Sequence, residues 1–220
     1  MPPRKIPRRR RRRPKSSWAR KGASWGSSIG GSIGQLAGTV KNIVESLNVE
    51  KKMYDKSINT TVNNSGSIYS LAEIAQGLGQ SDREGNKLKI TSVSTRGTIS
   101  ISSAATYTTA RIIIFVDTQQ VADTAPSVTS VLESASPLAF YNKLTLGRFQ
   151  ILEDNMYSMH TYDNPSPKFQ SHLKPMHHIY YNGANSTDIQ KGGVYVLVIS
   201  DQATNQPVFA MNHRTRYVDN

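Results

Sequence analysis

Alternating apolar side chains, which run from Met53 to the C-terminus, constrain the fold of this 220-residue chain more than any other feature. Short β-prone segments follow one another between turn signals, beginning with residues 58–62 and the turn at 63–66. Residues 111–116 and 194–199 are apolar without alternation, which is typical of strands covered on both faces. The sequence therefore predicts a layered β protein.

Further strands are predicted at residues 147–152, 168–173, 179–181 and 208–218. The last of these places Arg214 and Arg216 on one face, and on the other face Phe209, Met211, His213, Thr215 and Tyr217. Apolar residues stand at even positions up to Ile90 and at odd positions from Val93 onward. This change indicates a β-bulge near residues 91–93 or two strands that meet there.

One short helix is predicted inside the β region, where Ser127 is a capping residue ahead of Val128, Val131 and Leu132. Long connections such as residues 155–167 join the other elements. Crossover helices, which a parallel sheet needs, are missing from the pattern. We therefore expect an all-β, antiparallel sandwich of about eight strands.

The first 21 residues hold eleven of the 27 Lys and Arg side chains and no carboxylate. Subtracting these eleven charges from the formal net charge of +12 leaves about +1 for the rest of the chain. A block of like charge buries nothing apolar, so we expect residues 1–28 to be a disordered arm that binds nucleic acid. The residues expected to bind are Arg4, Lys5, Arg8, Arg9, Arg10, Arg11, Arg12, Arg13, Lys15, Trp18, Arg20 and Lys21.

Eleven phosphate contacts on a single strand imply a log-log salt slope of roughly −8, with little dependence on sequence. Trp18 and Trp25 add candidate stacking platforms for unpaired bases. The same basic tract is also typical of a nuclear localisation signal.

Residues 29–52 carry apolar side chains at helical spacing, with glycine at every fourth position in the first half. Two interpretations remain open. The segment is either a Gly/Ser linker that leads into a short, amphipathic docking helix, or a helix that self-associates or acts on membranes. The β domain is expected at residues 53–220.

Several segments resemble capsid proteins of small circular, Rep-encoding single-stranded DNA (CRESS-DNA) viruses. They are QGLGQSDREGNKLKIT at 76–91, STRGT at 94–98, ARIIIFVDTQQ at 110–120, GRFQILED at 147–154, GVYVLVISD at 193–201 and RTRYVDN at 214–220. The chain also resembles, more distantly, the coat proteins of the satellite tobacco necrosis virus type, which have the same shape and package RNA.

The resemblance implies a single eight-stranded jelly roll, about 60 copies in a T=1 icosahedral shell, and an inward-pointing basic arm. It implies two partners: further copies of the chain, and a single-stranded genome, for which circular DNA is favoured although phosphate contacts do not distinguish DNA from RNA. Localisation would be the virion, with the host nucleus and its import receptors during assembly. The alternative function is a cellular nucleic-acid-binding module with a basic tail.

Arg214 and Arg216 are expected either to join the nucleic-acid lining or to pair with acidic neighbours such as Glu153 or Asp154. Asp82 and Glu84 flank Arg83, which suggests local pairing, with calcium shared between subunits as a further candidate.

Enzyme chemistry finds little support in the sequence. The G-x-S-x-G letters at 22–26 lie in the basic arm, without the buried strand and helix that a nucleophile needs. His160, His172, His177 and His178 match no zinc spacing, and the chain has no cysteine. We therefore expect a structural protein and no enzyme.

Overall fold

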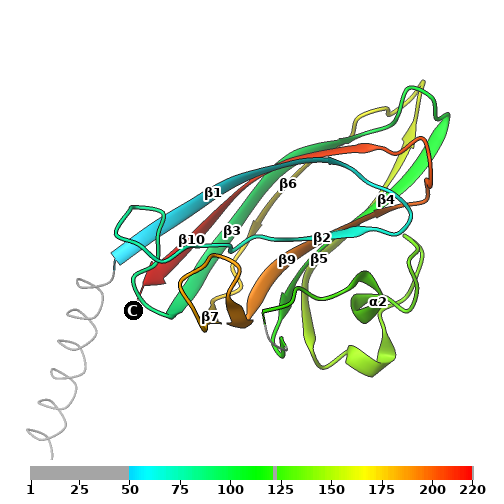
Figure 1. Ribbon diagram of the computed structural model, residues 1–220. Coiled ribbons are helices and arrows are strands. Elements are labelled where there is room, and N and C mark those ends of the chain that lie inside the picture. Colours follow the sequence, from blue (N-terminus) through cyan, green and yellow to red (C-terminus); the bar gives the residue numbers. More distant parts are fainter. Residues whose placement is uncertain (1–49, 121–122, 220) are drawn as a thin grey trace, which may run out of the picture. The chain divides into compact units, whose positions relative to one another are not determined.

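The computed structural model describes residues 50–120 and 123–219 (Figure 1). Ten strands, paired only in antiparallel fashion, make up most of this part. They are β1 (Glu50–Thr61), β2 (Ser67–Ser70), β3 (Lys87–Ser100), β4 (Tyr107–Asp117), β5 (Phe149–His160), β6 (Lys168–Leu173), β7 (His177–Tyr181), β8 (Ile189–Lys191), β9 (Gly193–Ser200) and β10 (Val208–Asp219).

Strand pairing is nested, as in one long hairpin that has been rolled up. β1 pairs with β10, β2 with β9, β3 with β6 and β7, and β4 with β5. β6 and β7 lie end to end along β3 and act as one strand, interrupted around Pro175 and Met176, where Met176 has a φ of 49°. Apart from the short β8, the strands therefore form two sheets of four, β1-β10-β3-β6/β7 and β2-β9-β4-β5, which is a jelly roll.

The main core lies between the two sheets. Every second side chain of β10 is buried there, as the alternation predicted. β4 and β9 are buried along nearly their whole length, because one face packs into this core and the other into a second cluster that contains Ile113, Phe115 and Leu197.

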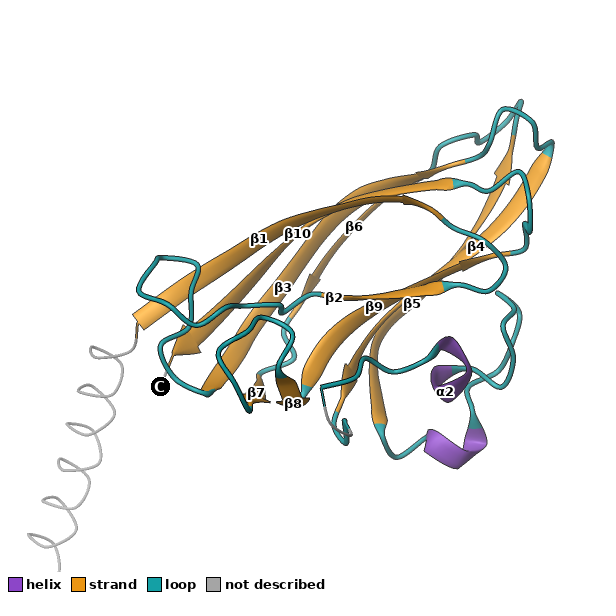
Figure 2. Cartoon of the chain, viewed as in Figure 1, coloured by secondary structure: helices purple, strands orange, loops and turns teal. Residues whose placement is uncertain are grey.

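The second cluster is closed by residues 123–148, which we call the covering segment. It contains α2 (Val128–Val131), capped by Ser127 as predicted, and the 3-10 helix η1 (Lys143–Thr145). Val131 and Leu132 pack against β4 and β9, so the outer face of the β2-β9-β4-β5 sheet is covered, and both helical turns lie on that side in Figure 2.

A β-bulge lies at the predicted place. Tyr217 pairs with Ile90 and Arg216 pairs with Ser92, so Thr91 is the extra residue of β3. Its hydroxyl donates to the carbonyl of Arg216 at 3.0 Å. The bulge explains why the burial parity of β3 differs on its two sides.

The predicted connection at residues 155–167 is wrong in its first half, because β5 continues to His160. The polar run Glu153, Asp154 and Asn155 hid the alternation that continues through Tyr157 and Met159. Those polar groups find partners in the fold, since Asp154 binds Arg111 and Glu153 accepts hydrogen bonds from Ser171 and Asn155.

β1 begins at Glu50, before the expected domain start at 53. The predicted arm at residues 1–28 and most of the predicted helix or linker at 29–52 lie outside the described residues.

Candidate nucleic-acid interface

The outer face of the β1-β10-β3-β6/β7 sheet, which we call the basic face, carries an excess of positive charge. Side chains alternate along these strands, so one set enters the core and the other faces solvent. One carboxylate, Asp55, stands on this face among the strand side chains that the structure describes. The cations of the face are Lys51, Lys87, Lys89, Arg96, Lys168, Arg214 and Arg216.

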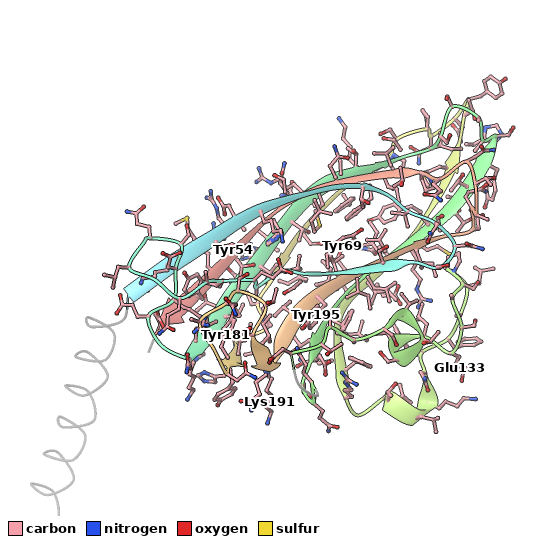
Figure 3. The ribbon with its side chains drawn as sticks, in the orientation of Figure 1. Tyr54, Tyr69, Glu133, Tyr181, Lys191 and Tyr195 are labelled. Atoms are coloured by element: carbon pink, nitrogen blue, oxygen red, sulfur yellow. The ribbon has the colours of Figure 1, made fainter. Side chains whose placement is uncertain are left out.

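No described segment lies over the basic face. Side chains stand off β1 and β3 into open space in Figure 3, whereas Tyr69 and Tyr195 lie on the ribbons of the opposite sheet. The net charge of the chain beyond its arm is near zero, but its charges are unevenly distributed, with an excess of cations on this one face. The sequence did not predict this excess, because β3, β6 and β10 each contribute only one to three of the cations.

Arg214 is held by Asp55 of the neighbouring strand β1. Its Nε lies 2.8 Å from Asp55 Oδ1 and its Nη2 lies 2.6 Å from Oδ2, and the side chains are 46% and 52% exposed. The hydrogen bonds from Arg214 lower the pKa of the Asp55 carboxyl. The predicted partners Glu153 and Asp154 are wrong, since both lie on β5 in the other sheet.

Arg216 has no carboxylate partner among the described residues. Its Nη1 donates to Ser94 Oγ at 3.1 Å, and the same hydroxyl lies 2.9 Å from His172 Nδ1. The strand register explains this placement, because Ser94 of β3 stands opposite His172 of β6, and Arg216 of β10 stands opposite Ser92, two residues from Ser94 on the same face of β3.

Arg96 was not singled out in the sequence. Its side chain is exposed, points to the same side as Ser94, and makes no hydrogen bond or ion pair within residues 50–120 and 123–219. The alternation of β3 would have placed it on the solvent side, but nothing in the sequence sets it beside Arg216. A shallow depression of about 630 Å³ lies here, lined by Asp55, Lys56, Ser57, Ser94, Arg96, Asn212, His213, Arg214 and Arg216.

The buried Arg83 does not pair with Asp82 or Glu84, which corrects the expected local pairing. Its guanidinium donates to carbonyls of Ile74, Gly85 and Gly183 and stacks on the ring of Tyr181 at 4.0 Å. Asp82 accepts from the amide of Gly79, and Glu84 binds Lys52. Arg83 thus anchors loops instead of contributing a surface charge.

No group of three or more His, Cys, Asp or Glu side chains within the described residues is arranged to hold a metal ion. Calcium shared between subunits stays a prediction. In the same part of the chain, no helix has the length and apolar character needed to span a membrane.

Of the predicted binding residues, only Arg214 and Arg216 fall within the described part of the chain. All the arm residues from Arg4 to Lys21, Trp18 included, lie outside it. The structure thus brings together two predicted cations and one that sequence reasoning missed.

These features define a jelly-roll protein with one covered sheet and one bare, basic sheet. The chain matches the family described as Satellite tobacco necrosis virus coat protein over residues 32–220. It is 32% identical over 171 residues to the coat protein of Satellite tobacco necrosis virus 2, which covers 74% of this chain and 84% of that protein. The chain therefore belongs to the satellite tobacco necrosis virus coat protein family.

Among solved structures, the chain is similar to one of Desmodium yellow mottle tymovirus, with a TM-score of 0.38, 9% identity, and coverage of 77% of this chain and 86% of the other. A pilus protein of Bacillus endospore appendages has a TM-score of 0.29 at 11% identity, covering 76% and 89%. Likenesses at this level add nothing to the family assignment.

The satellite tobacco necrosis virus coat proteins are thus the family shown, although in the sequence they were the more distant of two resemblances. The resemblance to capsids of CRESS-DNA viruses stays a prediction.

Proposed function

We propose that this chain is a structural coat protein, with no enzymatic activity, whose copies assemble into a closed shell around single-stranded nucleic acid. The observation that carries the proposal is the family relationship over residues 32–220. The jelly roll, a compact block with two large sheet faces, supports it, and so does the uncompensated charge of one of those faces.

In this proposal the arm and the basic face both bind the phosphates of the packaged nucleic acid. The arm, from Arg4 to Lys21, grips phosphate through its eleven cations, and the basic face, with Arg214 and Arg216, lines the same compartment. Arginine suits this role because its planar fork meets phosphate oxygens bidentately.

The finer features come from the resemblance to capsids of CRESS-DNA viruses. They are a T=1 shell of about 60 copies, a circular single-stranded DNA cargo, and passage of the coat protein through the host nucleus by import receptors that bind the arm. Digesting the protected nucleic acid with DNase or RNase after disrupting the particles decides the cargo. Retention of the signal in DNase and its loss in RNase would contradict the DNA assignment.

The role of the arm is tested by two full-length variants. In one, each of Arg8, Arg9, Arg10, Arg11, Arg12 and Arg13 is changed to Gln, and in the control each is changed to Lys. We expect the Gln variant to lose most nuclease-protected nucleic acid and the Lys variant, which keeps the charge, to retain it. Equal protection in the Gln variant and the parent would contradict the role of the arm.

A cellular nucleic-acid-binding module with a basic tail is the second candidate, because a bare basic sheet face is what such a module would use. Negative-stain microscopy of the purified chain separates the two functions. Uniform spherical particles support the coat protein, and a monomer or small oligomer at high concentration and low salt supports the module.

A further inference from the structure

Two polar side chains of the basic face, Arg216 and His172, contact the hydroxyl of Ser94, and Arg96 lines the same depression. We call Ser94, Arg96, His172 and Arg216 the Ser94 cluster. They come from β3, β6 and β10, and two adjoining shallow depressions both contact Ser94, Arg96 and Arg216.

The hydrogen-bond directions in the cluster follow from the chemistry of arginine. A guanidinium only donates, so Ser94 Oγ accepts from Arg216 Nη1. The hydroxyl hydrogen is then available for His172 Nδ1, which lies 2.9 Å away. A neutral His172 that accepts at Nδ1 carries its hydrogen at Nε2, so its second nitrogen is a donor as well.

The nitrogen groups that the cluster leaves uncommitted are therefore N–H donors. Arg216 spends one of its five N–H groups on Ser94, and Arg96 spends none within the part of the chain that the structure describes. The one carboxylate of the face, Asp55, has both oxygens bound to Arg214. The cluster therefore gathers several N–H donors and positive charge in one place, which favours an anionic ligand.

We propose that Arg96 and Arg216, assisted by His172, bind a backbone phosphate of a nucleic acid strand, and that Asp55 withholds Arg214 from that strand. This inference rests on the proposed function, because it takes the ligand to be packaged nucleic acid. The class of ligand is a phosphodiester.

The shape of the site favours a polymer over a small free anion. The depression is shallow and open, and the face continues along β3 to Lys89 and Lys87, which stands near the ring of Tyr180. From Lys87 to Arg96 a strand extends about 30 Å at ~3.3 Å per residue, enough for several nucleotides. An extended polyanion would meet cations along this whole path.

Asp55 determines how many cations of the basic face are free to bind the nucleic acid strand. The Asp55–Arg214 pair contributes no net charge, although Arg214 stands directly opposite Ser94 in the sheet. Changing Asp55 to Asn removes the carboxylate and leaves the guanidinium in place, so the site should gain a phosphate contact. A substitution that tightens binding is a stringent test, because a variant that misfolds would weaken it.

The experiment measures affinity for a fluorescent 20-nucleotide oligo(dT) between 50 and 200 mM salt. All variants are made in the full-length chain with Arg8 to Arg13 changed to Gln, so that the arm does not mask the sheet. We expect Arg96→Gln/Arg216→Gln to bind roughly five- to tenfold more weakly at low salt, and the log-log salt slope to fall by about 0.7. Lys143→Gln, which removes a charge on the covering segment, is the control and should stay within about twofold.

The masking by Asp55 is measured in the same way. Asp55→Asn should bind about three- to tenfold more tightly, with a slope about 0.7 steeper. The matched control Glu133→Gln adds the same charge on the covering segment and should leave affinity within about twofold. Asp55→Asn/Arg214→Gln should return to the parent affinity, because the gain acts through Arg214.

Three outcomes would overturn the inference. The first is an unchanged oligo(dT) affinity in Arg96→Gln/Arg216→Gln. The second is an equal gain in Asp55→Asn and Glu133→Gln. The third is a weaker binding of inorganic phosphate in Arg96→Gln/Arg216→Gln, followed by ³¹P line width, at unchanged oligo(dT) affinity, since the cluster would then be a free-phosphate site. Each of these results leaves the proposed function standing if the parent chain forms uniform spherical particles that protect nucleic acid, whereas the absence of such particles would overturn the proposed function itself.

Discussion

The two sheets of this jelly roll have outer faces of opposite character. The β2-β9-β4-β5 sheet buries its outer face beneath the covering segment, in a second apolar cluster that includes Phe115, Leu132 and Tyr195. The β1-β10-β3-β6/β7 sheet leaves its outer face bare and places seven cations and one carboxylate there. The covered outer face therefore stabilises the subunit, whereas the bare outer face is available for ligands.

Each face also contains a bidentate Arg–Asp pair, and the two pairs differ in burial. Arg111 Nε and Nη2 lie 2.8 and 2.6 Å from the carboxylate of Asp154, the same lengths as in the Arg214–Asp55 pair. Arg111 is only 10% exposed and also donates to the carbonyls of Pro137 and Ala139, so it ties the covering segment to β4. Burial opposes the charge of Asp154, but the hydrogen bonds from Arg111 and Tyr141 outweigh it and lower the pKa of the carboxyl.

The largest predicted effect is on the buried pair. Arg111→Ala should lower the free energy of unfolding by about 3–5 kcal/mol, because it removes the charge partner of Asp154, which keeps only the hydrogen bond from Tyr141, and leaves two carbonyls without this donor. Arg214→Ala should cost less than about 1 kcal/mol, since Asp55 remains solvated. Urea unfolding followed by far-UV circular dichroism measures both. Equal losses would contradict the contrast between the faces.

The covering segment itself has a buried and an exposed side. Leu132→Ala, at a fully buried position, should destabilise the fold by about 2–5 kcal/mol, because it opens a cavity in the second cluster. Leu144 is 94% exposed, so Leu144→Ala should stay within about 0.5 kcal/mol. The same unfolding measurement applies. A loss for Leu144→Ala as large as that for Leu132→Ala would mean that the segment packs through its other side.

A smaller effect is predicted on the inner side of the bare sheet, and it depends on pH. Burial lowers the pKa of His213 to about 4. The hydroxyl of Thr215 donates to Leu71 and can only accept from His213 Nδ1, and Nε2 has no partner in the described chain. Nearby Lys56 also opposes protonation, and the ring of Tyr54 lies 5.8 Å away.

Unfolding raises the pKa of this histidine to about 6.5, so the unfolded state binds the proton first as pH falls. Stability should therefore drop by about 2 kcal/mol between pH 6.5 and pH 5 through this group. His213→Phe should flatten this part of the pH profile. Parallel profiles for His213→Phe and the parent would rule out His213 as the source.

Much of the secondary structure could be predicted from local patterns. β6 has the predicted bounds, the doubly covered strands β4 and β9 were evident from their continuous apolar runs, and the cap at Ser127 and the bulge at Thr91 were in place. The second half of β5 was missed because polar residues stand where the pattern expects apolar ones. Arg111, the partner of Asp154, lies 43 residues away from it in the sequence, so no local signal marks the pair.

The candidate site was predictable only in part. Alternation assigned Arg214 and Arg216 to the face opposite the core side chains of β10, and the same rule applied to β3 would have included Arg96. Which of these cations is neutralised was beyond the sequence, since Asp55 lies 159 residues from Arg214.

The strand periodicity, the inward set of side chains and the concentration of charge in the arm follow from the amino-acid sequence, because each depends on neighbours a few residues apart. Only the folded chain shows which outer face is covered, which arginine is paired, and which cations lie near Ser94. These depend on the order and register of strands that the jelly roll brings together from distant parts of the chain, and hydrogen-bond pairing across a sheet fixes that register only once the roll has closed.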